Sequence, residues 1–407
     1  MRLLGISLAL RNILRHRVRS AIALSTICFS VVALMLAGGF IEWIFWATRE
    51  AAIQNGLGHI HVVRPGSLDQ GMANPFSYLL PEASPELTAL ESDPETTVVA
   101  PRLDFGGLIS HGDATLSFIG EGVDPDKEKL VSRVVQVSRG DGLSADDPKG
   151  VVIGQGLAVN LGVNVGDTVV LLATSSSGGT NGVEGHVRGF FSTEVKSYDD
   201  IALRVPISLA RQLLKVSGSS VWVMALDKTE HTREVVERLR SRFRAANLTF
   251  IPWFDLSDFY AKTVALLSRQ IDVVRVMIGL IIVLSISNVL IISVLERTGE
   301  IGTMMAMGTR RRVILRIFLV EGVMLGLVGG GAGLVLGLLL AHLISAIGIP
   351  MPPPPGRSAG YSAQILITWQ TAAAAFALAL GTTALASPYP AWKASRLVIV
   401  NALRHNR

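Results

Sequence analysis

The chain has 407 residues, of which 49% are hydrophobic and only 17% are charged, and its formal net charge is +5. Soluble globular proteins carry nearer a quarter charged residues, so this composition excludes an ordinary soluble domain and indicates a membrane protein. The one cysteine, Cys28, falls inside an apolar run, which excludes a fold held together by disulfides.

Four segments are long and apolar enough to cross about 30 Å of hydrocarbon, which takes roughly 20 helical residues. We predict transmembrane helices at residues 21–46, 271–295, 314–347 and 368–389. Residues 1–20 are predicted to form an interfacial elbow helix, because residues 2–14 are amphipathic. A cleaved signal peptide is the rival interpretation, but the apolar run is too long and basic residues continue to position 19.

Lys and Arg are distributed unevenly around the four spans. They cluster before the first span, in the 296–313 connection and in the 390–407 tail, whereas the 348–367 loop contains only Arg357. Under the positive-inside rule, both termini and the 296–313 connection are cytoplasmic, and residues 47–270 lie outside the membrane.

Residues 47–270, called the inserted domain below, mix short β-rich runs with helix-like stretches and turn signals. The predicted fold class is therefore an α-helical membrane protein with four transmembrane helices plus a large α+β periplasmic domain, inserted between helices 1 and 2. The domain can divide into two lobes. Its Ser/Gly-rich segment 175–185 is either a loose hairpin tip or a protruding partner-binding hairpin, and composition favours the loose tip.

Motifs for autonomous chemistry are not found in the sequence. There is no phosphate-binding loop ending in Gly-Lys-Ser/Thr, no His-Glu-x-x-His motif and no paired Cys/His spacing. His59 and His61 alternate on one predicted strand, but no further metal ligands accompany them. We therefore predict no catalytic, cofactor-binding or metal-binding residues in this chain and no contact with nucleic acid.

The third span carries a ladder of glycines. Pairs four residues apart form small-xxx-small patterns, which let helices approach closely. We predict that Gly326, Gly330, Gly333 and Gly337 serve helix packing within the chain, with a subunit contact as the alternative. Glu321, near the start of this span, is predicted to form an ion pair in the bundle rather than to relay protons.

The connection 296–312 has charged ends and an apolar centre. A solvated loop does not need such a centre, whereas a short helix that inserts into a groove of a partner does. Methionine suits such a contact because its side chain adapts its shape. The candidate contact residues are Glu300, Ile301, Met304, Met307, Gly308, Thr309 and Arg310.

Several motifs together resemble the permease subunits of ABC transporters of the FtsX/MacB/LolC type. Residues 8–15 (LALRNILR) resemble the elbow helix, and residues 296–302 and 306–311 resemble the coupling helix. Residues 318–322, 390–396 and 401–404 complete the pattern. Within the inserted domain, residues 122–125, 156–167 and 189–192 resemble the lipoprotein-releasing LolC/LolE branch. The 175–185 segment departs from that branch, because it lacks the proline-rich, apolar hairpin that recruits a lipoprotein carrier.

The resemblance implies a type VII ABC transporter, and the localisation it predicts is the bacterial inner (cytoplasmic) membrane. Two permease chains, identical or paralogous, would pair with two copies of a separate ATPase, which would hold ATP and Mg. The ATPase would push on the coupling helix at about residues 300–310, and the bundle would transmit this movement to the inserted domain. The cargo would be a lipoprotein or another lipid-anchored molecule, extracted from the outer leaflet toward the outer membrane, with a periplasmic carrier or adaptor as a further partner.

In a LolC/LolE-like complex, acyl chains lie between the first and second spans. The candidate cargo-contacting residues are Phe29, Met35, Phe40, Trp43, Val276 and Met277, and the alternative is that these side chains face membrane lipids. Two other functions remain open. One is MacB-like efflux of periplasmic substrates with an adaptor and an outer-membrane channel, and the other is FtsX-like signalling to a cell-wall hydrolase.

Overall fold

The computed structural model describes residues 17–70, 75–132, 136–193, 196–296, 298–351 and 361–395. The predicted elbow helix, the Arg357 loop and the C-terminal motif at 401–404 lie outside the described residues, apart from residues 17–20. The chain forms two compact units. One comprises the long helices, and the other is the inserted domain, which spans Ala47–Lys262 in the structure.

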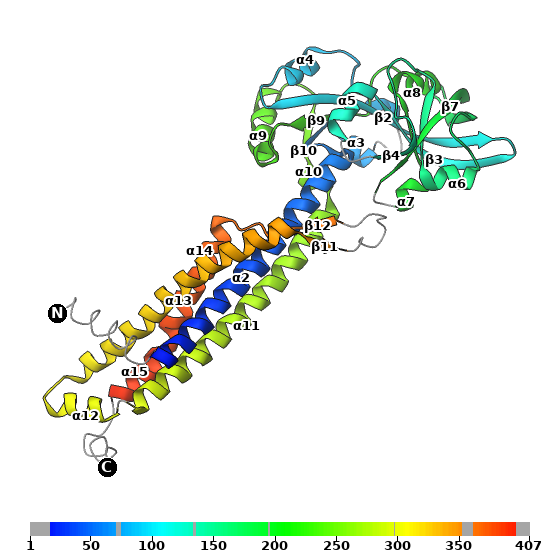
Figure 1. The fold of residues 1–407 in the computed structure, drawn as a ribbon. Helices are drawn as coiled ribbons and strands as arrows, with labels where there is room; N and C mark the ends of the chain where they lie inside the picture. Colours follow the sequence, from blue (N-terminus) through cyan, green and yellow to red (C-terminus); the bar gives the residue numbers. More distant parts are fainter. Residues whose placement is uncertain are drawn as a thin grey trace. The chain divides into compact units, whose positions relative to one another are not determined.

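Four helices are long and apolar enough to span a membrane, as predicted (Figure 1). They are α2 (Arg17–Ala52), α11 (Asp258–Glu296), α13 (Arg311–Ile347) and α14 (Trp369–Ala386). The helices α2 and α11 extend beyond the predicted spans into polar sequence, because no helix breaker stops them at the edge of the apolar run. The same unit contains α12 (Thr298–Ala306), α15 (Pro388–Ser395) and the strand pair β11 (Ile349–Met351) and β12 (Tyr361–Ala363).

The core of the bundle follows the helical period. On α2 the side chains of Ile27, Val31 and Met35 recur every four residues and are fully buried. They form one cluster with apolar residues of α11, with Leu325 of α13 and with alanines of α14. Small side chains on α14 allow neighbouring helices to come close.

The inserted domain is built on one sheet in the order β10-β1-β9-β2-β3-β8-β5-β7-β4, and β6 pairs with β2 and β7. The strands are β1 (Ile60–Val63), β2 (Thr96–His111), β3 (Ala114–Val123), β4 (Gln136–Gly140), β5 (Gly150–Gly154), β6 (Thr168–Thr174), β7 (Thr180–Ser192), β8 (Ala202–Pro206), β9 (Val221–Leu226) and β10 (Thr249–Pro252). The α-helices are α3 (Ser67–Gln70), α4 (Pro85–Glu91), α5 (Pro125–Val131), α6 (Gln155–Leu161), α7 (Lys196–Asp199), α8 (Ile207–Leu214), α9 (Thr232–Arg242) and α10 (Trp253–Leu256). A π-helical segment, Ile53–Leu57, follows α2.

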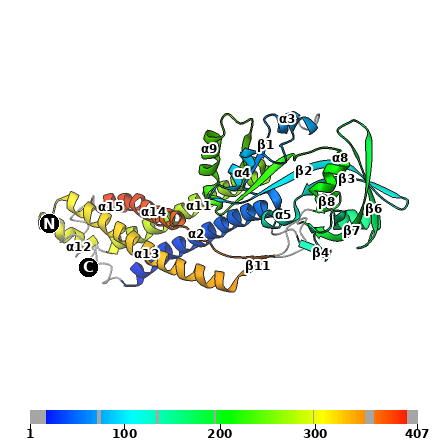
Figure 2. The ribbon, with the colours of Figure 1, turned by 90° about the horizontal axis from the view of Figure 1, so that it is seen from above.

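Two main hydrophobic cores divide this domain into lobes. One core lies among β1, β9, β10, α4 and α9, and the other lies among β3, β5 to β8, α6 and α8. The long strand β2 belongs to both, since Val99 packs in the first core and Leu103 in the second. In both views α4 and α9 lie at one end of the domain, and α8 and β7 lie at the other (Figure 1, Figure 2). The predicted α+β domain between the first and second spans is confirmed.

The Ser/Gly-rich segment is an ordered turn rather than a loose tip. Residues 180–185 belong to β7, and Thr174 pairs with Thr180. The Ser176 amide donates to the Leu214 carbonyl, and Asn181 Nδ2 donates to the Leu213 carbonyl. The last carbonyls of a helix have no partner within that helix, so the end of α8 provides acceptors that fix this turn. The hairpin tip that composition favoured is therefore confirmed, and its hydrogen bonds to the end of α8 are what composition does not reveal.

Candidate functional site

The connection between α11 and α13 folds as the short helix α12. Thr298 Oγ1 donates to the Val294 and Leu295 carbonyls at the end of α11. At the other end the Gly308 amide donates to the Met305 carbonyl, and the Thr309 amide donates to the Met304 carbonyl. Gly308 has φ of 90°, the left-handed conformation that glycine adopts readily at a helix C-terminus. This glycine, predicted as a partner contact, therefore has a capping role in the structure.

The apolar residues of this segment divide between two surfaces. Ile301 and Met305 are buried in a cluster with Phe318 of α13 and Ala391 of α15. Met304 is half-buried, whereas Met307 is 75% exposed. Glu300 and Arg310 are also exposed. The prediction of a partner contact is corrected for Ile301, because its side chain is already used inside the bundle. The predicted contact residues that remain exposed are Glu300, Met307, Gly308 and Arg310, and Thr309 is half-buried.

The six candidate cargo-contacting residues also divide. Phe29, Val276 and Met277 are 65%, 72% and 58% exposed in the single chain, and Phe40 is half-buried. In contrast, Met35 is fully buried and Trp43 is 7% exposed. Met35 packs where Gly337 leaves space for its sulfur atom. Met35 and Trp43 are therefore corrected to interior positions of the bundle.

The four predicted packing glycines are all buried and face neighbouring helices. Gly326 and Gly330 face Thr383 and Phe376 of α14. Gly333 and Gly337 face Val31 and Met35 of α2. A Cβ added at Gly333 would lie 2.7 Å from Val31 Cβ and 2.9 Å from the Cys28 carbonyl oxygen.

Gly333→Leu is expected to destabilise the bundle, because backbone atoms of α2 cannot move aside as a flexible side chain can. Overpacking of this kind costs about 1–3 kcal/mol and occasionally more. The matched control is Gly331→Leu, since nothing lies within 4 Å of a Cβ added there. The melting temperature of the purified permease should fall for Gly333→Leu and stay unchanged for Gly331→Leu. Equal melting temperatures would contradict close packing at Gly333.

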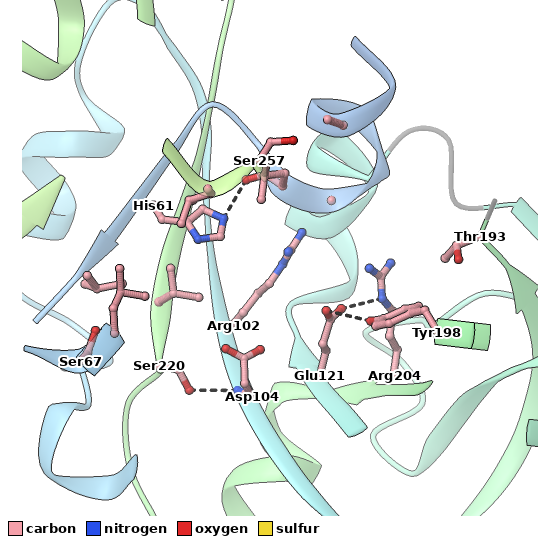
Figure 3. Close-up of a pocket in the computed structure, with 17 residues that line it drawn as sticks. His61, Ser67, Arg102, Asp104, Glu121, Thr193, Tyr198, Arg204, Ser220 and Ser257 are labelled. Atoms are coloured by element: carbon pink, nitrogen blue, oxygen red, sulfur yellow. Dashed lines mark hydrogen bonds and ion pairs between the residues drawn. The ribbon is translucent and has the colours of Figure 1, made fainter. Parts of the chain in front are cut away.

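The inserted domain contains a pocket of about 680 Å³, with charged side chains on its floor (Figure 3). The strand register explains why these groups meet. Asp104 of β2 pairs with Glu121 of β3, and Glu121 pairs with Arg204 of β8. Cross-strand partners point to the same face of a sheet, so these three side chains form a row. Arg102 joins them because residues two apart on a strand share a face.

Most of these charges are paired and buried. Arg102 Nε and Nη2 donate to the two carboxylate oxygens of Glu128 at 3.0 and 2.7 Å. Arg204 Nε donates to Glu121 Oε2 at 2.8 Å, and the Tyr198 hydroxyl donates to Glu121 Oε1 at 3.0 Å. Ser132 also donates a short hydrogen bond to Glu128. Arg102, Arg204 and Glu128 are each less than 8% exposed.

The surroundings shift the pKa values of these groups in different directions. Burial would raise the pKa of Glu121, but Arg204 and Arg102 hold it below its usual range. Burial raises the pKa of Tyr198, and Glu121 raises it further. Burial, together with Arg102, lowers the pKa of His61 to about 4. The protein around Asp104 desolvates its carboxylate, although the side chain is open to the pocket, and this effect, followed by Glu121, raises the pKa of Asp104 to about 6.

Asp104→Asn is expected to stabilise the inserted domain at pH 7.5. The pKa of Asp104 is about 6 in the folded state and 3.8 as the ordinary value, so the unfolded state loses this proton at lower pH. The free energy of unfolding therefore decreases as pH rises from about 4 to about 6, and the loss is complete at pH 7.5. Because Asp104 is open to the pocket, solvent screening reduces the gain to about 1 kcal/mol. Denaturation at pH 7.5 should show the gain, and denaturation near pH 4 should not. Stabilisation that is unchanged with pH would contradict the assigned titration.

Sequence reasoning missed this pocket, apart from His61. The available signal was the pair Arg102 and Asp104, two charged residues two positions apart in a strand that is otherwise largely apolar. Glu121 and Arg204 each stand alone in their strands, and only the tertiary register brings them to Asp104.

Comparison with known proteins identifies the chain. Residues 20–242 match the MacB-like periplasmic core domain, and residues 273–399 match the FtsX-like permease C-terminal domain. The chain belongs to the FtsX/MacB-type family of ABC transporter permeases. This confirms the predicted family, and members of this family act with ABC ATPases.

Relatives whose names state an activity come from two branches of this permease family. A macrolide export ATP-binding/permease protein MacB of Syntrophobacter fumaroxidans is 30% identical over 184 residues, which cover 42% of this chain and 23% of that protein. A lipoprotein-releasing system transmembrane protein LolC of Xylella fastidiosa is 22% identical over 334 residues, which cover 77% of this chain and 79% of the relative. The chain thus spans about a quarter of the MacB relatives it matches.

One solved structure is similar to part of this chain. The periplasmic region of MacB from Actinobacillus actinomycetemcomitans is 15% identical, with a TM-score of 0.36. The match covers 52% of this chain and 94% of that structure.

Proposed function

We propose that this chain is the permease subunit of an ATP-driven complex that extracts lipoproteins, or other lipid-anchored cargo, from the outer leaflet of the bacterial inner membrane. The observation that carries the proposal is the length of the LolC match, which covers most of both chains. The chain would act as a pair of permeases, identical or paralogous, with two copies of a separate ATPase holding ATP and Mg. Both termini and α12 would lie in the cytoplasm.

Two surfaces of the helical unit support this mechanism. Met307, Glu300 and Arg310 offer an exposed contact beside α12 for an ATPase groove. Phe29 on α2 and Val276 and Met277 on α11 are exposed apolar side chains that suit contact with acyl chains. ATP-driven movement of α12 would pass to α13 through the buried contact of Ile301 and Met305 with Phe318.

MacB-like efflux is the second candidate function. It is favoured by the family model over residues 20–242 and by the higher identity to MacB relatives. In that case a periplasmic adaptor and an outer-membrane channel would accompany the permease. The ordered turn at 175–179, held by the end of α8, gives no support to carrier docking at that hairpin.

The proposal is tested by purifying the chain with its ATPase in the absence of ATP and identifying the bound molecules by mass spectrometry. Lipid extraction predicts co-purified triacylated lipoproteins. Efflux predicts none, together with ATPase activity that responds to a soluble compound and to an adaptor. Finding only bulk phospholipid, with ATPase activity indifferent to lipoprotein, would contradict the extraction proposal.

A further inference from the structure

The pocket in the inserted domain has the size of a small-molecule site. Its volume of about 680 Å³ lies in the range of about 300–1,000 Å³ in which proteins hold small ligands. Such sites combine apolar walls with a few placed polar groups. Here the apolar walls come from Leu57, Val63, Leu68, Val221 and Leu256. These side chains are contributed by segments far apart in the chain.

The lining of the pocket and the Glu128 carboxylate behind it together carry an excess of one negative charge when Asp104 is ionised. Asp104, Glu121, Arg102 and Arg204 line the pocket, whereas Glu128 does not line it and is paired with Arg102. His61 is neutral at ordinary pH, and its Nε2 is hydrogen-bonded to the Leu57 carbonyl at 2.7 Å.

The excess charge is located on Asp104. Each guanidinium is already engaged, Arg102 by Glu128 and Arg204 by Glu121. The Asp104 carboxylate forms no hydrogen bond or ion pair with the described residues and is accessible from the pocket. Figure 3 shows Asp104 between Ser220 and Glu121, below Arg102, and the bond to Ser220 uses the Asp104 amide rather than its carboxylate.

We propose that this pocket binds an organic cation, with an ammonium group on the Asp104 carboxylate and an apolar body against the walls. An anion would be repelled by the Asp104 carboxylate, and both guanidinium groups that could bind it are already paired with Glu128 and Glu121. A metal ion would lack ligands, since the described residues contain no group of three or more His, Cys, Asp or Glu side chains that could hold one. The hydroxyls of Ser67, Ser220 and Ser257 also line the pocket and supply polar surface for the cation.

Binding should depend on pH in the direction set by Asp104. The groups around it are Arg102 on β2, Glu121 on β3, Glu128 on α5, Arg204 on β8, Tyr198 on α7 and His61 on β1. His61 stays neutral above about pH 4, because burial lowers its pKa to about that value. Since the pKa of Asp104 is raised to about 6, the cation should bind well at pH 7.5 and poorly at pH 5.

The test uses the full chain in lipid nanodiscs, with phenethylammonium as the probe and 2-phenylethanol as its neutral match. Calorimetric titration at pH 7.5 should show binding of the cation to the wild type and at least about a tenfold weaker affinity for Asp104→Asn. The control Asp113→Asn, at an exposed position in the turn between β2 and β3, should bind as the wild type does. The neutral alcohol should not compete.

Three results would overturn the proposal. They are no binding of the cation to the wild type at millimolar concentration, equal affinity of Asp104→Asn, or equal competition by the alcohol. A cation that binds only to the lipid would behave identically in all variants. The measurement needs neither ATPase nor ATP, so its failure leaves the proposed permease function untouched.

Discussion

Met307→Asp is expected to weaken association with the partner ATPase by about thirtyfold or more and to leave the permease folded. Met307 is 75% exposed beside α12, so a charge there costs the permease little. In an interface, the same carboxylate would be desolvated without a partner and would replace an adaptable apolar contact. A central contact of this kind is worth about 2 kcal/mol or more, which is about a thirtyfold loss of affinity.

Two other substitutions distinguish a loss of the ATPase interface from a loss of permease folding. Val159→Asp, on the exposed face of α6, introduces the same charge at a position that is 74% exposed and should leave ATPase association unchanged. Met305→Asp places a charge in the cluster with Val294 and Phe318 and should disrupt the permease itself. Affinity purification of the ATPase with each variant measures both effects. Wild-type recovery of the ATPase with Met307→Asp would contradict the assigned coupling surface.

Glu128→Gln is expected to destabilise the inserted domain by about 3–5 kcal/mol, the typical cost of leaving a buried charge without its partner. Glu128 accepts two hydrogen bonds from Arg102 and lies 3.7 Å from Arg204 Nη1. Glutamine keeps one acceptor oxygen but places an NH2 donor group against the other Arg102 donor, and it carries no charge. The Arg102 guanidinium would then stay buried beneath the pocket without its bidentate partner.

The same helix provides the control for this experiment. Lys129 is paired with Asp126, and both side chains are more than 60% exposed. Exposed pairs contribute about 0–1 kcal/mol, so Lys129→Met should have little effect. Hydrogen exchange of the β2 and α5 amides in the full chain reports local stability without assuming that the two units unfold together. Unchanged exchange in Glu128→Gln would show that the network does not stabilise the domain.

The membrane-spanning part was predictable from sequence because the bilayer fixes both the length and the polarity of its helices. The packing glycines of α13 were also predictable from sequence, since Gly326 and Gly330, and likewise Gly333 and Gly337, are four residues apart, which places each pair on one helix face. The coupling motif and the inserted domain were recognisable as family patterns. These features are local in sequence or repeat with a simple period.

The features that sequence reasoning missed depend on tertiary packing. Ile301 and Met305 share a helix face that packs against Phe318. This contact joins two helices, so the sequence of the short helix does not predict it. Met35 was predicted to be an apolar side chain on an outer face, but it is buried because Gly337 leaves space for its sulfur atom. Asp104 and Glu121 meet only through the register of β2 and β3, which a single sequence does not reveal.

The central claim is ATP-driven extraction of a lipid-anchored cargo. The most direct test reconstitutes the permease and its ATPase in proteoliposomes with a triacylated lipoprotein and follows release of the lipoprotein to a soluble acceptor. The account predicts release only with hydrolysable ATP, and loss of release with Met307→Asp but not with Val159→Asp. Release that is independent of ATP, or no release despite active ATP hydrolysis, would contradict it.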